Sequence, residues 1–337
     1  MKTAFFLRAA GLLAALLWTA AAARAELKVA TLHPLLTDLA HQVGGASVTV
    51  LAVVAPGTDM HHFSPSAADV KKLGAASLVL ASGKNLENYL GKLRDNLTAG
   101  QEIVEVGAEI PSLTRAEAEE LVEDQARRSG AEDDHAEDKG KDHDHGHGHD
   151  HGGVDPHWWN SVENMRRAAK VLATVFSRKD PANAEKYAAN AAAYGKKLGE
   201  LKKWARREIL RIPADRRKLA TSHLALSYFA KEFGFRLIPV QGMNPEVPAT
   251  SRDLAAAMDT IRKNKITAVF PEQGVNPKHL TELSRETGVK FGGELIADGN
   301  GTGELATFTG AFEHNVNEIV KALAPAAPAS PSAVPPP

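Results

Sequence analysis

The sequence predicts an α/β protein made of two doubly wound parallel-sheet lobes that are joined by one long helix. Three observations support this fold class. Short β-rich runs alternate with helical patterns in the first part of the chain, and the same alternation starts again near Lys218. Between the two series lies the longest helical pattern of the sequence, over residues 181–212. Alternating strands and helices are typical of a parallel sheet that carries helices on both faces.

Residues 1–25 are interpreted as a secretory signal peptide. Lys2 and Arg8 supply a positive start, residues 9–23 form an apolar run, and Ala23-Arg24-Ala25 fits an A-x-A cleavage site. The alternative is a membrane anchor, but the apolar run is shorter than the ~20 residues that span a bilayer. The 337-residue sequence contains no cysteine, so there is no cysteine to carry a lipid. We therefore expect a soluble periplasmic protein that is released by cleavage and is not a lipoprotein.

The N-terminal lobe is expected over residues 26–180. Its strands are short apolar runs, and Gly-Gly at 44–45 and Pro-Gly at 56–57 end two of its elements. The predicted strands are 27–31, 48–54, 77–81 and 103–106, and the predicted helices are 35–43, 66–73 and 86–97.

The linking helix is expected over residues 181–212. Asp180 and Pro181 are a good helix start, with Asp as the N-cap and Pro at the first helical position. Apolar residues then recur at spacings of three and four, from Tyr187 to Ala205, and charges occupy the opposite face. At 1.5 Å per residue such a helix is roughly 45 Å long. It would restrict how freely the lobes move, although two glycines within it leave a bend open.

The C-terminal lobe is expected over residues 213–323 and repeats the alternation of the first lobe. The predicted strands are 218–221, 235–240, 266–270 and 289–291, and the predicted helices are 224–233, 253–264, 277–288 and 308–323.

Two segments break the pattern and are expected to be disordered. Residues 132–151 hold six histidines and eight acidic residues with almost no apolar side chain, so they cannot bury a core. Residues 324–337 form a tail rich in Ala, Pro and Ser.

The composition excludes several classes of function. Hydrophobic residues make up 43% of the chain and charged residues 24%, which is ordinary for a globular protein. The 40 basic and 41 acidic residues leave no basic excess for nucleic acid. Without cysteine there are no disulfides, thiolate nucleophiles or cysteine metal sites, so a metal site must be built from histidines and carboxylates.

Histidines and acids follow predicted strands in four places, at residues 57–63, 154–160, 222–224 and 296–299. Ligands of open α/β sheets bind beyond the carboxyl ends of the strands, which here places a metal site in the cleft between the lobes. A nitrogen- and oxygen-donor shell suits Zn²⁺, and four protein ligands would leave no open position for a catalytic water. No two candidates have the spacing of a local zinc motif, so the residue pattern alone leaves the set open. The candidate ligands are His61, His157, His223 and Asp298.

Four motifs in the same order resemble the periplasmic metal-binding proteins of ABC importers for zinc and manganese, the zinc-uptake solute-binding family. Residues 56–61 (PGTDMH) resemble its P-G-x-x-P-H loop, and residues 155–159 (DPHWW) resemble its D-P-H-x-W segment. Residues 222–229 (SHLALSYF) and 292–298 (GGELIAD) are similar to its third and fourth ligand segments. The resemblance covers nearly the whole mature chain.

The resemblance implies two lobes joined by a rigid helix, with the metal ion between them and with His61, His157, His223 and Asp298 as its ligands. It also implies delivery to an ABC permease with its ATPase. Met60 departs from the proline of the family loop, which could loosen that loop. The doublet His61-His62 leaves a swap of the two open.

The resemblance also bears on the choice of metal. Manganese-selective relatives tend to carry Glu at the position of His223, and three imidazoles favour Zn²⁺ over Mn²⁺. We therefore expect a high-affinity zinc-binding protein, with manganese or mixed Zn/Mn binding as the alternative. The histidine-rich segment points the same way, as a weak metal-gathering loop rather than as an acidic spacer. Its histidines are His135, His143, His145, His147, His149 and His151.

Several polar residues at strand ends have two interpretations. Glu272 is expected to hold a ligand imidazole or to cap a helix, and His33 to line the cleft or to form structural hydrogen bonds. Trp158 and Trp159 are expected to pack under a loop, and Asn160 to be a helix N-cap.

Competing functions are a metal-dependent adhesin, a periplasmic zinc store and a zinc hydrolase, although no H-E-x-x-H segment occurs in the sequence. We expect a monomer that is not an enzyme, with limited lobe movement, and with a periplasmic metallochaperone as a further candidate partner.

Overall fold

The structure is a computed structural model that describes residues 26–96, 98, 100–122, 153–241 and 249–325. The predicted signal peptide, the histidine-rich segment 132–151 and residues 326–337 of the tail lie outside the described residues. Within the described part of the chain, no helix has the length and apolar character that crossing a membrane requires.

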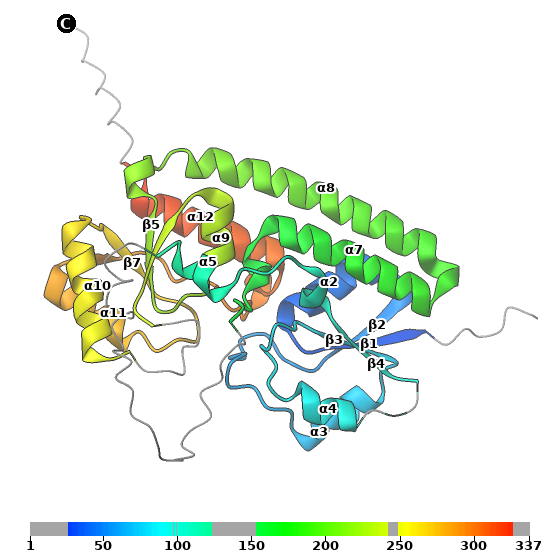
Figure 1. Ribbon diagram of the computed structural model, residues 1–337. Coiled ribbons are helices and arrows are strands. Elements are labelled where there is room, and N and C mark those ends of the chain that lie inside the picture. Colours follow the sequence, from blue (N-terminus) through cyan, green and yellow to red (C-terminus); the bar gives the residue numbers. More distant parts are fainter. Residues whose placement is uncertain (1–25, 97, 99, 123–152, 242–248, 326–337) are drawn as a thin grey trace, which may run out of the picture.

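The N-terminal lobe is a four-stranded parallel sheet with the order β2-β1-β3-β4. Helix α2 covers the inner face, towards the long helices, and α3 and α4 lie on the other face (Figure 1). The strands are β1 (Leu27–Thr31), β2 (Val48–Ala52), β3 (Leu78–Ala81) and β4 (Glu102–Glu105), and the helices are α2 (Pro34–Gly44), α3 (Ala67–Gly74) and α4 (Leu90–Asp95). Helix α5 (Arg115–Glu119) instead lies against the C-terminal lobe (Figure 1), where Glu117 lies 3.5 Å from Lys231.

The C-terminal lobe repeats this topology, with the order β6-β5-β7-β8 and all strands parallel. The strands are β5 (Lys218–Thr221), β6 (Arg236–Pro239), β7 (Ala268–Phe270) and β8 (Lys290–Phe291), and the helices are α9 (Ser227–Phe233), α10 (Ser251–Lys263), α11 (Lys278–Thr287) and α12 (Phe308–Leu323). The repeated strand order confirms the predicted fold class of two parallel-sheet lobes.

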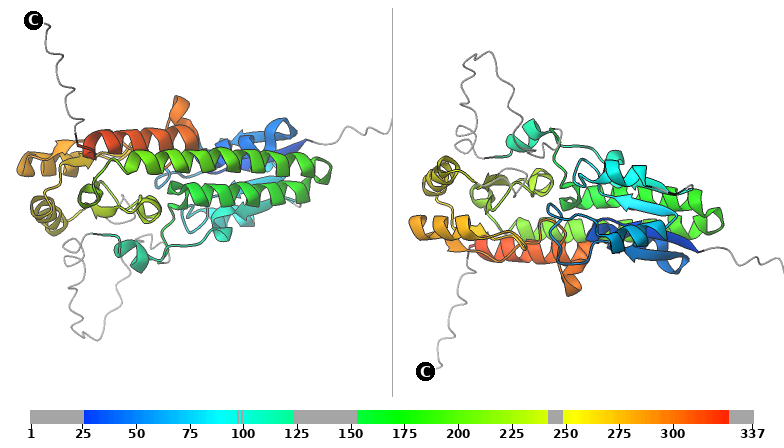
Figure 2. Two further views of the ribbon diagram at one scale, coloured as in Figure 1. Left: turned by 90° about the horizontal axis from the view of Figure 1, so that it is seen from above. Right: turned by 90° about the horizontal axis from the view of Figure 1, so that it is seen from below.

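The long helix α8 (Ala184–Ile209) runs along both lobes (Figure 1). It contacts α2 of the first lobe and α12 of the second, and from above α8 and α12 lie side by side (Figure 2). A second long helix, α7 (Val162–Lys179), packs against α8. No residue range was predicted for α7, although Asn160 was expected to cap a helix at this point. The apolar residues of α7 alternate with charges at helical spacing, and this periodicity is the pattern that would have identified it.

The start of the linking helix differs from the expectation. Pro181–Asn183 form a 3₁₀ turn, and Asp180 makes no capping bond to the backbone. Instead, Asp180 Oδ2 accepts hydrogen bonds from Asn183 Nδ2 at 2.6 Å and from the Tyr187 hydroxyl at 2.8 Å. Two side-chain donors therefore satisfy the carboxylate that was expected to cap the helix.

One hydrophobic core is continuous through both lobes. It includes Val29 and Leu78 of the first sheet, Leu219 and Phe270 of the second, and the buried face of α8. Smaller clusters lie under α3 and α4 and under α10 and α11, on the outer faces of the two sheets. The apolar contact between the lobes is thus part of the main core.

Two predicted helices begin later than expected. Helix α4 starts at Leu90 rather than residue 86. Glu87, which was expected in the first turn, instead accepts from the backbone N–H groups of Ser82 and Gly83 at 2.6 and 2.9 Å. Gly83, Lys84 and Asn85, just before the expected start, have positive φ values of 79°, 55° and 61°. Left-handed backbone cannot continue a right-handed helix. Helix α9 starts at Ser227 rather than residue 224, since the residues before it form the loop that carries His223. The remaining predicted elements are present, with ends displaced by a few residues.

Candidate metal site

His61 lies in the loop between β2 and α3. Its backbone N–H donates to Asp59 Oδ1 at 2.9 Å, and its side chain is buried. Met60, which was expected to loosen the loop, is buried in the main core. The other histidine of the doublet, His62, points outward with 62% of its side chain exposed and lies 2.7 Å from Asp59 Oδ2. Asp59 and Met60 therefore fix which of the two histidines faces inward.

His157 follows Asp155-Pro156 just before the 3₁₀ turn Trp158–Asn160. Asp155 Oδ1 accepts from the backbone N–H of His157 at 2.9 Å and lies 2.8 Å from its Nδ1. Both side chains are fully buried. The role of Asp155 was not predicted, although a carboxylate two residues before a candidate ligand is a local pattern that could have indicated it.

His223 lies two residues after the end of β5, and Glu272 lies two residues after the end of the neighbouring strand β7. Glu272 Oε2 lies 2.5 Å from His223 Nδ1 and accepts from the backbone N–H of His223 at 3.3 Å. Neither side chain is exposed. Of the two roles expected for Glu272, its geometry matches contact with an imidazole, here that of the candidate ligand His223.

Asp298 lies in the loop after β8. The backbone of Ile296, two residues earlier, is held in place by the side chain of Asn315 of α12. Asn315 accepts from the N–H of Ile296 at 2.8 Å and donates to its carbonyl at 2.9 Å. Gly299 follows with φ of +66°, and a Cβ there would lie 2.7 Å from His33 Cε1. A glycine is therefore required for the chain to turn away directly after Asp298.

The four predicted ligand residues converge on one point between the lobes. His157 Nε2 lies 3.4 Å from His61 Nε2. Asp298 Oδ1 lies 3.6 Å from His61 Nε2 and 3.5 Å from the Nε2 atoms of His157 and His223. One donor atom from each residue lies within 4.8 Å of all the others. Donors at ~2.1 Å from a tetrahedral ion would be ~3.4 Å apart, so the spacing fits a four-coordinate shell.

Hydrogen bonds orient this shell. With Nδ1 of His157 and of His223 donating to a carboxylate, the Nε2 lone pair of each ring is free to face the centre. Among the described residues, Asp298 Oδ1 and His223 Nε2 make no hydrogen bond, although both are buried. Buried polar atoms are normally paired, so these two atoms fit a cation that is held between them.

The charges of the site perturb two of its pKa values. Burial alone would lower the pKa of His223, but the carboxylates of Glu272 and Asp298 raise it well above its ordinary value. Burial would likewise raise the pKa of Asp298, but His223 and His61 hold it well below its usual range. The site therefore stabilises positive charge on nitrogen beside a negative oxygen, which is the electrostatic environment a cation requires.

His33 lies beside the shell and has a structural role of its own. Its Nδ1 accepts from the backbone N–H of Leu35 at 3.1 Å as the N-cap of α2, which is the structural hydrogen bond that was expected. Burial lowers the pKa of His33 to about 3, so its ring is neutral and carries its proton on Nε2. The ring packs 4.4 Å from that of Trp159.

The expectation for Asn160 was wrong. The N-cap of α7 is Ser161, whose Oγ accepts from the N–H of Asn164. Asn160 instead donates to two carbonyls of the other lobe. Trp158 and Trp159 are buried in the core as expected, and their indole nitrogens donate to Ser82 and to the Ala297 carbonyl respectively.

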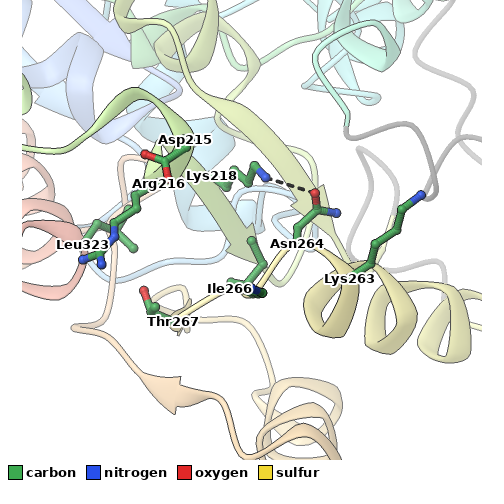
Figure 3. A pocket seen from close by; sticks show the side chains of 9 residues that line it. Asp215, Arg216, Lys218, Lys263, Asn264, Ile266, Thr267 and Leu323 are labelled. Atoms are coloured by element: carbon green, nitrogen blue, oxygen red, sulfur yellow. Dashed lines mark hydrogen bonds between the residues drawn. The ribbon is translucent and has the colours of Figure 1, made fainter.

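A cavity of about 420 Å³ lies where β5 begins and where the chain leads from α10 into β7, and none of its lining residues belongs to the shell (Figure 3). Lys218 Nζ donates to Asn264 Oδ1 across it at 3.0 Å. Lys263 and Lys265 lie at the C-terminal end of α10, where positive charge compensates the helix dipole. The lining of this cavity contains no histidine and one acid, Asp215, so the cavity offers no donor set comparable to that of the shell.

Fold and site together define an extracytoplasmic solute-binding protein for a metal ion. The chain matches the ZnuA family, described as "zinc-uptake complex component A periplasmic", over residues 29–322, and it belongs to this family. It is therefore the metal-binding component of an ABC importer, and the family consists of binding proteins rather than enzymes.

Relatives differ in the metal that their names state. The manganese-binding lipoprotein MntA of Bacillus subtilis is 33% identical over 306 residues, covering 88% of this chain and 90% of the relative. The zinc-binding protein TroA of Treponema pallidum is 28% identical over 311 residues, covering 90% and 91%. The solved structure of that zinc-binding protein superposes with a TM-score of 0.73 at 25% identity, covering 89% of this chain and 100% of the other.

A Mn-bound periplasmic metal-binding protein from candidatus Liberibacter asiaticus has the same fold. Its TM-score is 0.71 at 23% identity, and the match covers 88% of this chain and 99% of the other.

Proposed function

We propose that the protein captures Zn²⁺ as its cargo, through His61, His157, His223 and Asp298, and delivers it to the permease of the importer. The supporting observation is the shell itself, in which Asp298 Oδ1 lies 3.5–3.6 Å from all three imidazole Nε2 atoms and the Nε2 atoms of His61 and His157 lie 3.4 Å apart. Such a shell needs no further ligand to complete a tetrahedron around Zn²⁺.

The donor chemistry supports zinc over manganese. Imidazole nitrogen suits Zn²⁺, whereas Mn²⁺ favours oxygen ligands and six-fold coordination. The printed names of relatives support manganese as the second candidate, since MntA is described as manganese-binding and TroA as zinc-binding.

Competition calorimetry on the metal-free protein tests the choice. We expect one tight site with Zn²⁺ bound more tightly than Mn²⁺, and equal or tighter binding of Mn²⁺ would overturn the proposal of zinc.

The histidine doublet supplies a matched pair of variants. His61→Ala should lower the affinity by about tenfold or more, since it removes a ligand, while His62→Ala should leave the affinity unchanged. The exposed side chain of His62 points away from the shell. Both variants replace a histidine by alanine, but only His61→Ala removes a side chain from the shell. Equal affinities for both variants would show that His61 is not a ligand.

We further propose that the signal peptide is cleaved after Ala25 and that the mature protein is an unlipidated monomer. The absence of cysteine supports the lack of a lipid. The mass of the protein recovered from the periplasm tests both cleavage and lipidation, and light scattering tests the oligomeric state.

A further inference from the structure

Asn160 connects the loops that hold the candidate ligands in the two lobes. Its side-chain Nδ2 donates to the carbonyl of Ala297 at 2.8 Å and to the carbonyl of Ala225 at 3.0 Å. Ala297 directly precedes Asp298, and Ala225 lies two residues after His223. Asn160 itself lies three residues after His157. One amide therefore touches the backbone of both candidate ligand loops of the second lobe, while Asn160 itself belongs to the His157 loop of the first.

The neighbours of Asn160 form bonds across the same junction. Trp159 Nε1 donates to the Ala297 carbonyl at 2.9 Å, and Ser161 Oγ lies 2.6 Å from Glu232 Oε2 of α9. Lys202 of α8 forms an ion pair with the other oxygen of Glu232, also at 2.6 Å. Asn160 differs from these neighbours because it reaches both ligand loops from a single atom.

The position of Asn160 requires a side chain that can donate two hydrogen bonds. Asn160 is 8% exposed, so water does not readily replace its hydrogen bonds. An amide NH₂ carries two hydrogens and can donate to two carbonyls, whereas a carboxylate of the same shape carries none and would face them with like charge. Capping of α7 does not explain the residue, since Ser161 caps that helix.

We propose that Asn160 is a positioning residue that couples the ligand loops of the two lobes, so that the ion leaves when both hydrogen bonds break and Asp298 and His223 move away from His157. This inference rests on the proposed function. It assigns to Asn160 a role in the rate of metal release rather than in coordination.

Metal release is measured by stopped-flow transfer of Zn²⁺ from the loaded protein to a chelator. Asn160→Leu and Asn160→Asp, which remove both donors, should release the ion about tenfold faster than the wild type. The matched control is Asn164→Leu, since Asn164 is also buried but donates within its own lobe, to the Trp158 carbonyl at 3.0 Å. This control should keep the wild-type release rate even where it lowers stability.

Amide hydrogen exchange on the metal-free proteins supplies a readout that is independent of metal. Exchange in residues 222–226 and 295–299 should rise in both Asn160 variants and stay unchanged in Asn164→Leu. If Asn160→Leu does not fold, Asn160→Ser replaces it, since a short hydroxyl leaves less misfit but reaches neither carbonyl as the amide does.

Wild-type release and exchange in the folded Asn160 variants would overturn the inference. Equal effects of Asn160→Leu and Asn164→Leu on release would also overturn it, because the change would then be general destabilisation. Failure of the wild type to bind Zn²⁺ would refute the proposed function instead, and the exchange measurement would still decide whether Asn160 couples the loops.

Discussion

Replacing Glu272 tests whether the shell depends on a carboxylate that touches no metal. Its Oε2 is 2.5 Å from His223 Nδ1, and both side chains are fully buried. Hydrogen bonds to charged groups contribute about 1.5–3 kcal/mol, and partners of metal-ligating histidines are worth 10–100-fold in affinity. We expect Glu272→Ala to lower the affinity for Zn²⁺ by about 100-fold, or about 3 kcal/mol. Glu272→Gln keeps an acceptor without the charge and should cost about tenfold.

Proton release gives the same prediction a second measurement. The carboxylates of Glu272 and Asp298 raise the pKa of His223 well above its ordinary value, so the metal-free ring holds a proton at neutral pH that the metal ion must displace. Affinity should therefore fall as the pH falls. Glu272→Gln removes one of these two charges, so it should release fewer protons on binding than the wild type does at neutral pH.

Calorimetry in two buffers of different ionisation enthalpy measures affinity and proton release together. Glu286→Gln is the control, since it makes the same change at an exposed position of α11. An affinity of Glu272→Ala within twofold of the wild type would refute the reasoning about orientation. Equal proton release by the wild type and Glu272→Gln would refute the reasoning about charge.

Three further predictions concern the rest of the molecule. Deletion of residues 132–151 should remove weak Zn²⁺ equivalents in a calorimetric titration and leave one tight site; loss of the tight site would contradict a separate role for the segment. Burial raises the pKa of Glu87 to about 7 from 4.5, so folding favours its neutral form. The contribution of Glu87 to the free energy of unfolding is therefore fully present below pH 4.5, and roughly 3 kcal/mol of it is lost as the pH rises through 7. In urea unfolding, the free energy of unfolding of Glu87→Gln should therefore rise by about that much relative to the wild type between pH 4.5 and pH 7.5. A difference between the two proteins that does not change with pH would argue against a buried acid. Small-angle scattering should give nearly equal radii of gyration for metal-free and loaded protein, because the core is continuous through both lobes; a wide closure would contradict this.

The fold class followed from local patterns, and the candidate ligands followed from strand-end positions together with the four motifs that resemble the family. Alternating strands and helices predict parallel sheets, and the residues just after parallel strands meet at one edge of a sheet. His223 lies just after β5, and His61 and Asp298 lie in the loops that follow β2 and β8, which is why they were expected in the cleft. The start of α4 was not predicted, because the Glu87 side chain accepts from the backbone N–H groups of Ser82 and Gly83, beside three consecutive residues with positive φ. Two of these residues, Lys84 and Asn85, are not glycine, so their sequence gives little warning of that backbone.

The sequence by itself determined the two-lobed arrangement, the long helix and the residue types that converge between the lobes, because each depends on periodicity or on position relative to a strand. Only the tertiary structure decided which groups hold that shell in place. Glu272 meets His223 across 49 residues of chain, and Asn160 meets Ala225 and Ala297 across 65 and 137. A side chain such as that of Asn160 looks locally like a helix cap, and the packing of one lobe against the other gives its amide two distant carbonyls instead.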